Sequence, residues 1–300
     1  MLLFPQAKLN IGLFVTRRRD DGYHILQTLF YPIDWCDALE ILPLSDETMG
    51  ENCQLTGDGR VAWHQQGITV DCDPEQNLCV KAYRLMQQRF PELPAVAMHL
   101  VKQIPFGAGL GGGSSDGAHA LLMLREMFQL EVNDAGVEQM AARLGADCAF
   151  FCRSGNGRNT AGNGARMSAQ YCEGIGHELV EHPLSLKGMY IVVVKPPFGV
   201  STREAYAGVH PAVPSVPLDL LLQRPLGEWR ATVHNDFEDS VFPHYPQLAE
   251  VKDELYKRGA TYASMSGSGS ALFGFFDKEQ ADCATWFGEG YETRGHWALV

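Results

Sequence analysis

The chain has 300 residues, which exceeds the usual size of one compact core and predicts two domains. Its composition, 45% hydrophobic and 20% charged, is typical of a soluble globular protein, and it contains no apolar run long enough to cross a bilayer. The net charge of −12 argues against nucleic acid as a partner, because polyanion binding rests on a basic surface.

The cysteines and the N-terminus indicate a cytoplasmic protein without a membrane partner. Eight cysteines are scattered along the chain, and none forms a CxxC pair or a Cys/His cluster with zinc spacing. The first ten residues, MLLFPQAKLN, lack the basic region and the continuous apolar core of a signal peptide. In so acidic a chain, an anionic substrate must be held by local features such as lysines, helix N-termini and loop amides.

In the first half of the chain, residues 7–15 (AKLNIGLFV) and 25–33 are predicted strands on either side of the turn RRRDDGYH. Residues 95–102 are a further predicted strand that leads to Pro105. Beyond the glycine-rich loop, AHALLMLREMF from Ala118 predicts a buried helix with Ser115 or Asp116 as its N-cap. A second helix is predicted over residues 136–144, and CAFFC (148–152) is predicted to be a short buried strand.

In the second half, residues 154–169 (SGNGRNTAGNGARMSA) predict a loop or a disordered segment, because they contain almost no core formers. MYIVVVK (189–195) predicts a strand, and residues 246–258 predict an amphipathic helix that Gly259 ends. SMSGSGSALFGFF then predicts a glycine-rich turn that feeds another strand. Strands followed by helices in both halves predict an α+β architecture with a break between residues 154 and 185.

The loop PFGAGLGGGSSD (105–116) is the strongest candidate for a phosphate site. A Walker A loop is excluded because Gly113 stands where its lysine would be, and a Rossmann GxGxxG lacks its supporting acid, since Glu126 falls inside the predicted helix. Three consecutive glycines allow several amides to converge on one anion, and the next helix directs its positive end at the same place. A flexible linker is the ordinary alternative, but linkers seldom run from a strand directly into a capped helix.

Three segments in this order, PQAKLN, PFGAGLGGGSSD and SMSGSGSALFGF, resemble the three motifs of the GHMP kinase superfamily, which phosphorylates small-molecule alcohols from ATP. The segments AKLNIGLFVTRRRDDGYHILQTLF and LGADCAFF are similar to the branch whose small-molecule substrate is cytidine diphosphate methylerythritol, and DGYH distinguishes this branch from homoserine and mevalonate kinases. The resemblance implies a two-domain GHMP kinase fold. A ribosomal protein S5 domain 2-like, ATP-binding domain would span residues 1–171, and a ferredoxin-like domain that contributes to substrate binding would span residues 172–300.

The resemblance implies two catalytic residues. Asp147 matches the family's general base, which accepts the proton of the position-2 hydroxyl, whereas from the sequence alone it could simply close a helix. Lys8 matches the lysine that stabilises charge at the reacting oxygens, although a snorkelling edge lysine is the ordinary explanation. Asn10, which would project from the same strand face as Lys8, matches a substrate-binding asparagine.

The remaining implied contacts are with ATP and with the cytidine group. Tyr23 would stack on cytosine, His24 would hydrogen-bond its polar edge, and Tyr206 would close the far side beside Thr202. Alternatives stay open, because DGYH could be a polar turn, Tyr206 a packing residue and SGSGS, with Gly267, a plain turn. Magnesium is expected to bind together with ATP. Asp116 and Ser115 are candidate ligands for it, and no separate metal site is expected in the protein. The ATP contacts would be Lys102, Pro105, Gly107, Gly109, Leu110, Gly111, Gly112, Gly113, Ser114 and Ser115.

The sequence departs from the family pattern at residues 154–169, where about a dozen extra residues precede YCEGIG. A tolerated surface insertion is the ordinary explanation, because loop length costs little free energy, and a lid or a partner-binding segment is the alternative. Two other functions stay open: a GHMP kinase for an alcohol without cytidine, and a non-catalytic nucleotide-binding regulator. We expect a monomer or a weak homodimer.

Overall fold

The computed structural model describes residues 1–49, 53–69, 73–155, 168–176 and 178–298. Internal contacts divide the chain into two compact units built from separated segments. Unit 1 comprises Met1–Ala7, Trp35–Pro105 and Gly111–Met167, and unit 2 comprises Lys8–Asp34, Phe106–Leu110 and Ser168–Val300. The domain division at residues 171/172 stays a prediction. Within the described ranges, every helix is too short or too polar to cross a membrane.

Unit 1 contains a five-stranded sheet in the order β1-β4-β7-β6-β5. The strands are β1 (Leu2–Leu3), β4 (Ala38–Pro43), β5 (Gln54–Leu55), β6 (Val61–Gly67) and β7 (Val96–Lys102). β6 and β7 pair in parallel, with Val61 opposite Val96, and the other neighbours pair antiparallel. β7 confirms the strand predicted over residues 95–102 and delivers Lys102 to the start of the glycine-rich loop.

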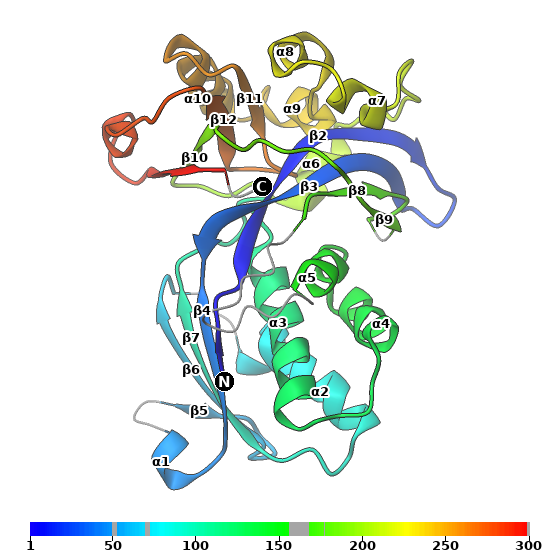
Figure 1. The fold of residues 1–300 in the computed structure, drawn as a ribbon, viewed down its shortest axis with the longest axis vertical. Coiled ribbons are helices and arrows are strands. Elements are labelled where there is room, and N and C mark those ends of the chain that lie inside the picture. The colour runs from blue at the N-terminus through cyan, green and yellow to red at the C-terminus, as the bar shows by residue number, and fades with distance from the viewer. Residues whose placement is uncertain (50–52, 70–72, 156–167, 177, 299–300) are drawn as a thin grey trace. The chain divides into compact units, whose positions relative to one another are not determined.

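Four helices of unit 1 lie together on one face of this sheet (Figure 1): α2 (Leu78–Arg89), α3 (Gly112–Met127), α4 (Asp134–Leu144) and α5 (Cys148–Gly155). The short α1 (Asp46–Met49) and η1 (Pro74–Gln76) complete the unit. Asn133 caps α4 by accepting a hydrogen bond from the Gly136 amide, so the predicted helix is confirmed and begins two residues earlier than expected. α3 is buried along most of its length, as its apolar sequence predicts.

Two local predictions in unit 1 were wrong. Residues 148–152 form the start of helix α5 and not a strand: Cys148 and Cys152, four residues apart, are both buried, and the Cys152 thiol lies 3.9 Å from the Ala118 carbonyl of α3. Such a short apolar run carries no periodicity that separates the two structures. The N-cap of α3 is Gly111 and not Ser115 or Asp116, because the glycines themselves adopt the first helical turn.

Unit 2 contains two four-stranded sheets. The first has the order β2-β3-β8-β9 and contains β2 (Gln6–Arg18), β3 (His24–Cys36), β8 (Gln170–Glu173) and β9 (Glu178–Glu181). The second is antiparallel in the order β11-β12-β10-β13 and contains β10 (Tyr190–Lys195), β11 (Tyr262–Met265), β12 (Leu272–Phe276) and β13 (Glu292–Trp297). The strands predicted at residues 7–15, 25–33 and 189–195 are therefore confirmed. β2 and β3 join through the turn at residues 19–23.

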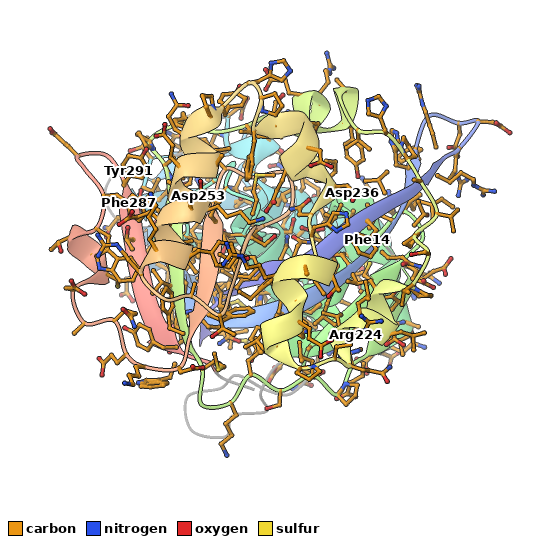
Figure 2. The ribbon with its side chains drawn as sticks, turned by 90° about the horizontal axis from the view of Figure 1, so that it is seen from above. Phe14, Arg224, Asp236, Asp253, Phe287 and Tyr291 are labelled. Atoms are coloured by element: carbon orange, nitrogen blue, oxygen red, sulfur yellow. The ribbon has the colours of Figure 1, made fainter. Side chains whose placement is uncertain are left out.

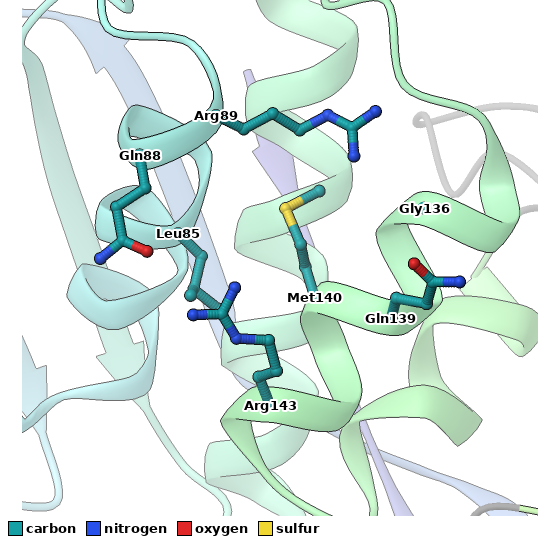
Figure 3. Close-up of a pocket in the computed structure, with 7 residues that line it drawn as sticks. All are labelled: Leu85, Gln88, Arg89, Gly136, Gln139, Met140 and Arg143. Carbon is teal, nitrogen blue, oxygen red and sulfur yellow. The ribbon is translucent and has the colours of Figure 1, made fainter.

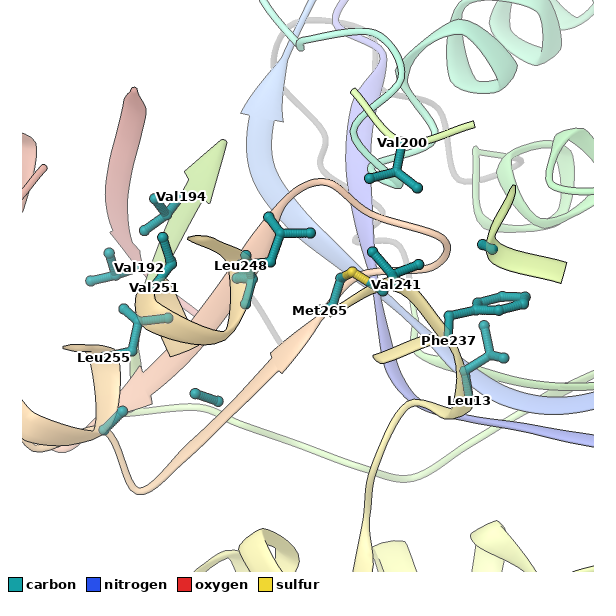
Figure 4. Packing of buried hydrophobic residues seen from close by; sticks show 14 of the residues in the cluster. Leu13, Val192, Val194, Val200, Phe237, Val241, Leu248, Val251, Leu255 and Met265 are labelled. Atoms are coloured by element: carbon teal, nitrogen blue, oxygen red, sulfur yellow. The ribbon is translucent and has the colours of Figure 1, made fainter. Parts of the chain in front are cut away.

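The helices of unit 2 are α6 (Thr202–Ala207), α7 (Leu218–Leu222), α8 (Trp229–Thr232), α9 (Asp236–Val241) and α10 (Pro246–Lys257), with η2 (Leu226–Glu228) and η3 (Cys283–Thr285). α10 confirms the predicted amphipathic helix, and its buried residues Leu248, Val251 and Leu255 recur at helical spacing. They pack against Val192 and Val194 of β10 in the core of this unit (Figure 4).

β2 is tied to α9 at the edge of this core. The Val15 amide donates to Asp236 at 2.6 Å, and Figure 2 shows Asp236 beside Phe14 on the strand. Asp236 also accepts from His234 at 2.9 Å, and the Phe14 and His234 rings lie 4.8 Å apart. The predicted α+β class is confirmed. The 154–169 insertion lies outside the described residues over 156–167, so its role stays a prediction.

Candidate active site

The first half of the glycine-rich loop, Phe106–Leu110, packs in unit 2 against the turn of residues 266–270. The Ala271 amide donates to the Ala108 carbonyl at 3.1 Å, and the Ser266 hydroxyl donates to the Gly109 carbonyl at 2.9 Å. A Cβ atom on Gly109 would stand 1.9 Å from the Ser266 carbonyl oxygen, and the residue has a φ of +73°. Only glycine fits there, because side chains disfavour that conformation and the space is already filled.

Lys8 on β2 is buried and not a snorkelling residue, with 2% of its surface exposed. Its ammonium group donates to Asn10 Oδ1 at 2.5 Å and to the Gly109 carbonyl at 2.8 Å, and it stands 5.2 Å from the centre of the Phe30 ring. A buried lysine is stable only where its charge is compensated. These contacts attach Lys8 to the loop that is predicted to hold ATP.

Asn10 is fixed on three sides. Its side-chain amide donates to Thr28 Oγ1 at 3.0 Å, its backbone amide donates to the Ser266 hydroxyl at 3.1 Å, and its Oδ1 accepts from Lys8. Gly267 approaches so closely that an added Cβ would lie 3.1 Å from Asn10 Oδ1. The structure therefore brings Lys8, Asn10, Gly109 and Gly267 together within unit 2.

The second half of the loop opens helix α3 in unit 1. Gly111 adopts φ 71° as the N-cap, and the Ser115 amide donates back to the Gly111 carbonyl at 2.9 Å. The amides of Gly112, Gly113 and Ser114 therefore occupy the first turn, where a helix has no internal acceptors for its N–H groups. These amides and the positive end of the helix dipole favour an anion such as a phosphate.

Lys102 lies beneath this turn and not on its open side. Its ammonium group donates to Asp37 and, at 2.8 Å, to Asp116, and all three side chains are at least 96% buried. A Cβ on Gly112 would stand 2.9 Å from Lys102 Nζ, so the charge lies directly against the helix terminus. Burial alone would lower the pKa of Lys102, but Asp116 and Asp37 raise it above its usual value.

Ser115 and Asp116 face inward. The Ser115 hydroxyl is buried 3.4 Å from His119 Nδ1, and one carboxylate oxygen of Asp116, Oδ1, has no hydrogen-bond partner in the described structure. Burial raises the pKa of Asp116 to about 7, with a further contribution from Asp37 that opposes the effect of Lys102. Both side chains therefore contact buried groups, and their role as magnesium ligands stays a prediction.

Asp147 lies in the turn between α4 and α5, half-buried and directly before Cys148. The turn packs against the first turn of α3, because a Cβ on Gly145 would lie 3.8 Å from the Ser114 hydroxyl and 3.5 Å from Cys148 Sγ. Burial raises the pKa of the Cys148 thiol to about 12, so this neighbour is not a competing nucleophile. The turn that carries Asp147 thus adjoins the helix end expected to hold phosphate.

Tyr23, His24 and Tyr206, which are predicted to hold cytosine, all lie in unit 2, and that role stays a prediction. The His24 and Tyr206 rings stack on each other at 4.7 Å with an interplanar angle of 24°, whereas Tyr23 is 62% exposed. Tyr206 also packs edge-on against Phe237 at 4.8 Å, and Thr202 Oγ1 lies 3.3 Å from the Ser268 hydroxyl. Partial burial and then the charge of Arg18 lower the pKa of His24, which favours the neutral imidazole.

Three supporting residues were missed from the sequence: Asp37, Thr28 and Asn235. Asn235 is 1% exposed and donates to the carbonyls of Met265 and Gly267, both at 2.8 Å, and so fixes the 266–270 turn. It also caps α9 by accepting from the Phe237 amide, and an N-cap pattern in HNDF could have identified it. Thr28 stands in the strand β3 and Asp37 is the single residue between β3 and β4, and no sequence pattern identifies the partners of either.

Comparison with known proteins defines the class. The model of the GHMP kinases N terminal domain matches residues 77–155, and the model of the GHMP kinases C terminal domain matches residues 218–284. The structure is similar to that of a Methanococcus jannaschii mevalonate kinase, with a TM-score of 0.63 at 12% identity over 100% of this chain and 98% of that one, which shows the fold alone. The molecule is a small-molecule kinase with the GHMP fold, as predicted.

More similar relatives define the family. A 4-diphosphocytidyl-2-C-methyl-D-erythritol kinase of Bacteroides thetaiotaomicron is 47% identical over 93% of both chains, and one of Parabacteroides distasonis is 41% identical over 96% of this chain and 99% of the relative. A crystal structure of 4-(cytidine 5'-diphospho)-2C-methyl-D-erythritol kinase matches with a TM-score of 0.71 and 32% identity over 91% of this chain and 89% of that one. This chain belongs to the 4-diphosphocytidyl-2-C-methyl-D-erythritol kinase family.

Proposed function

We propose that this chain transfers the γ-phosphoryl group of ATP to the position-2 hydroxyl of 4-diphosphocytidyl-2-C-methyl-D-erythritol, a step in the non-mevalonate synthesis of isoprenoid precursors. The observation that carries the choice of substrate is the 47% identity to a kinase with that name over 93% of both chains. The family to which the chain belongs implies the use of ATP. The individual residue roles below are proposals that rest on the local geometry.

The glycine-rich loop holds the ATP phosphates in this proposal. The first-turn amides of α3 at Gly112, Gly113 and Ser114 donate to phosphate oxygens, and Pro105, Gly107, Gly109, Leu110 and Gly111 shape the approach. Lys102 contributes its charge from beneath Gly112 and makes no direct contact, because its ammonium group is already bound by two carboxylates. Ser115 supports the turn through its backbone, since its hydroxyl faces His119.

Asp147 and Lys8 carry the chemistry. The substrate oxygen forms a bond to the γ-phosphorus while the bond to the bridging oxygen of ADP breaks, and ADP leaves with that electron pair. Asp147 accepts the proton that the hydroxyl loses, and Lys8 stabilises negative charge on the reacting oxygens. The buried hydrogen bonds of Lys8 to Asn10 and Gly109 support this role, because a fixed charge needs no reorganisation during the reaction.

The cytidine group binds on unit 2. Tyr23, with its ring exposed, stacks on cytosine, and the neutral imidazole of His24 hydrogen-bonds the polar edge of the base. Tyr206 orients His24 by stacking on it, a modification of the direct contact predicted from the sequence. Thr202, Asn10 and Gly267 complete the substrate contacts. Binding of this distant group positions the hydroxyl for transfer.

Magnesium is proposed to arrive with ATP, where it would neutralise phosphate charge. The protein's described residues contain no cluster of three potential metal ligands, and the two candidate side chains beside the loop, Ser115 and Asp116, face inward. Magnesium often keeps water and substrate phosphates as most of its ligands, so this arrangement is compatible with ATP delivery. We also propose that the chain is cytoplasmic and forms a monomer or a weak homodimer.

A coupled ADP-release assay tests the function. With ATP and magnesium, we expect turnover with 4-diphosphocytidyl-2-C-methyl-D-erythritol and none with homoserine or mevalonate. Asp147→Asn should lower kcat by about 10²–10⁴-fold without altering nucleotide affinity, because it removes the proton acceptor while keeping the shape. Asp253→Asn, on the exposed face of α10 (Figure 2), is the charge-matched control. Turnover of another alcohol, or an active Asp147→Asn variant, would refute the corresponding assignment.

A further inference from the structure

Unit 1 contains a cavity of about 310 Å³ between helices α2 and α4 that the proposed reaction does not use. Figure 3 shows how its side chains are arranged. Leu85 of α2 and Met140 of α4 supply apolar surface in its centre, and Met140 is 6% exposed. Arg89 extends from the end of α2 over Met140, and Arg143 extends from the last turn of α4 toward Leu85.

Arg89 and Arg143 differ in their ion pairing from the other arginines on the helices α2, α3 and α5. Arg84 of α2 pairs with Asp58 and Glu75 at 2.6 Å each, Arg125 of α3 pairs with Asp134 at 2.6 Å, and Arg153 of α5 pairs with Glu138 at 3.0 Å. Among the residues that the structure describes, neither Arg89 nor Arg143 has a carboxylate partner. Both side chains are exposed to solvent, and the Arg89 guanidinium lies 5.8 Å from the centre of the Phe90 ring. Two guanidinium groups without a carboxylate partner among the described residues therefore line one cavity in a chain with a net charge of −12.

Helix electrostatics explain each arginine only in part. A cation in the last turn of a helix is stabilised by the dipole, which accounts for one arginine at the end of α2 and one at the end of α4. The dipoles do not require both side chains to line the same cavity. Gln88 and Gln139 also line the cavity, on opposite sides of it.

We propose that this cavity is a second anion site, which binds the phosphate group of a small molecule. Each guanidinium group can donate two parallel hydrogen bonds to phosphate oxygens, and the apolar surface of Leu85 and Met140 accommodates a small organic group. The site is separate from the glycine-rich loop. Leu78 at the start of α2 is 4.0 Å from a Cβ built on Gly113, whereas Arg89 lies eleven residues further, a rise of about 16 Å along a helix.

A ligand in this cavity would contact the helix that leads to the proposed base. Arg143 is in the last turn of α4, and the chain continues through Gly145 to Asp147. The site therefore offers a place at which a phosphorylated metabolite could be sensed in unit 1. The proposal concerns binding, and it holds or fails whichever alcohol the kinase phosphorylates.

Calorimetry on the full chain tests the proposal. Saturation with a non-hydrolysable ATP analogue and magnesium occupies the glycine-rich loop, and glycerol phosphate and inorganic phosphate then serve as probes. We expect one site, whose affinity falls at least tenfold in Arg89→Gln and in Arg143→Gln. Arg89→Lys should weaken it less than Arg89→Gln, since charge is kept while the planar pair of donors is lost.

Lys81→Gln is the control, because it removes one positive charge from α2 outside the cavity lining and should leave the affinity unchanged. Tighter binding of glycerol phosphate than of inorganic phosphate would assign the site to a phosphate ester, and equal binding would assign it to free phosphate. Absence of binding to the unmodified chain, or an affinity in both Arg→Gln variants equal to that of the unmodified chain, would overturn the proposal.

Discussion

The two glycine-rich segments, residues 105–113 and residues 266–270, have similar compositions but different surroundings. In the second segment both glycines are packed: a Cβ on Gly267 would lie 3.1 Å from Asn10 Oδ1, and one on Gly269 would lie 2.7 Å from Met265 Sδ. In the first segment Gly107 has nothing within 4 Å, and Gly113 has only the end of Leu78 at 4.0 Å. The second segment is a packed support, whereas the first keeps open space beside Gly107 and Gly113 although Gly109 and Gly112 are packed.

This difference shows that a glycine motif does not by itself distinguish packing from ligand binding. Gly109 belongs to the first segment, but the Ser266 carbonyl oxygen occupies the space in which its Cβ would stand. The surroundings of each glycine therefore predict whether its substitution should change the free energy of unfolding or the affinity for ATP. Substitutions at single positions can therefore test the comparison.

The largest expected effect is that of Gly109→Ala. The added Cβ would stand 1.9 Å from a backbone oxygen, which cannot rotate away, and alanine would be strained at a φ of +73°. We expect the free energy of unfolding to fall by about 3 kcal/mol or more, as for other substitutions that force a backbone shift. Chemical denaturation monitored by circular dichroism measures it.

Gly188→Ala is the matched control. Gly188 has a φ of +91° but nothing within 4 Å of its Cβ position, so alanine there carries the conformational strain alone. That strain should cost about 1 kcal/mol. If Gly109→Ala were no more destabilising than Gly188→Ala, the close packing between the loop and the 266–270 turn would be wrong.

Long periodic segments were predicted well from the sequence because their burial pattern is local. The alternating β7 and the amphipathic α10 appear within two residues of their expected bounds. The strand prediction for CAFFC was wrong because five apolar residues suit a strand and a buried helix equally. Packing against α3 decides between the two structures. The prediction of the N-cap of α3 was wrong because the side chains of Ser115 and Asp116 contact His119 and Lys102 inside the fold.

The candidate site shows a similar limit. Resemblance to a family supplied Lys8, Asp147 and the glycine-rich loop, and these assignments stay proposals. The buried partners of Lys102 could not be predicted, because Asp37 lies 65 residues before it and the contact depends on the pairing of β4 with β7. The stacking of His24 on Tyr206 likewise joins residues from distant segments of unit 2.

The second largest expected effect concerns Asp116, whose buried side chain lies beneath the first turn of α3. Burial raises the pKa of its carboxyl group to about 7 from an ordinary value of 3.8. Between these two pH values the folded protein holds a proton that the unfolded chain has released, so the stability contributed by this group falls as the pH rises toward 7. Asp116→Asn removes the titration.

Urea unfolding of the unmodified chain and of Asp116→Asn at pH 5 and pH 8 measures this effect. Relative to the variant, the unmodified chain should lose stability on going to pH 8, by on the order of 1 kcal/mol or more, because one pKa unit corresponds to about 1.4 kcal/mol. Asp134→Asn, at an exposed carboxylate of α4, should not produce this change. A stability difference between the unmodified chain and Asp116→Asn that is constant across this range would contradict the raised pKa.

The smallest effect on stability is expected from Gly113→Ala, in the open part of the loop. Its Cβ would meet only Leu78 Cδ1 at 4.0 Å, an ordinary contact, and its backbone is helical. Alanine should raise the free energy of unfolding by about 0.4–1 kcal/mol, since it restricts the unfolded chain. The same methyl group stands beside the amides proposed to hold phosphate, so the KM for ATP should rise several-fold.

Alanine at an open glycine should raise the free energy of unfolding while it lowers the affinity for ATP, and this combination distinguishes an open glycine from a packed one. Gly227→Ala is the control, because Gly227 also has nothing within 4 Å of its Cβ position but lies in η2, away from the loop in sequence. It should leave the KM for ATP unchanged. If Gly113→Ala were as destabilising as Gly109→Ala, the open part of the loop would be packed like the 266–270 turn. If it left the KM for ATP unchanged, the first turn of α3 would not be where the phosphates bind.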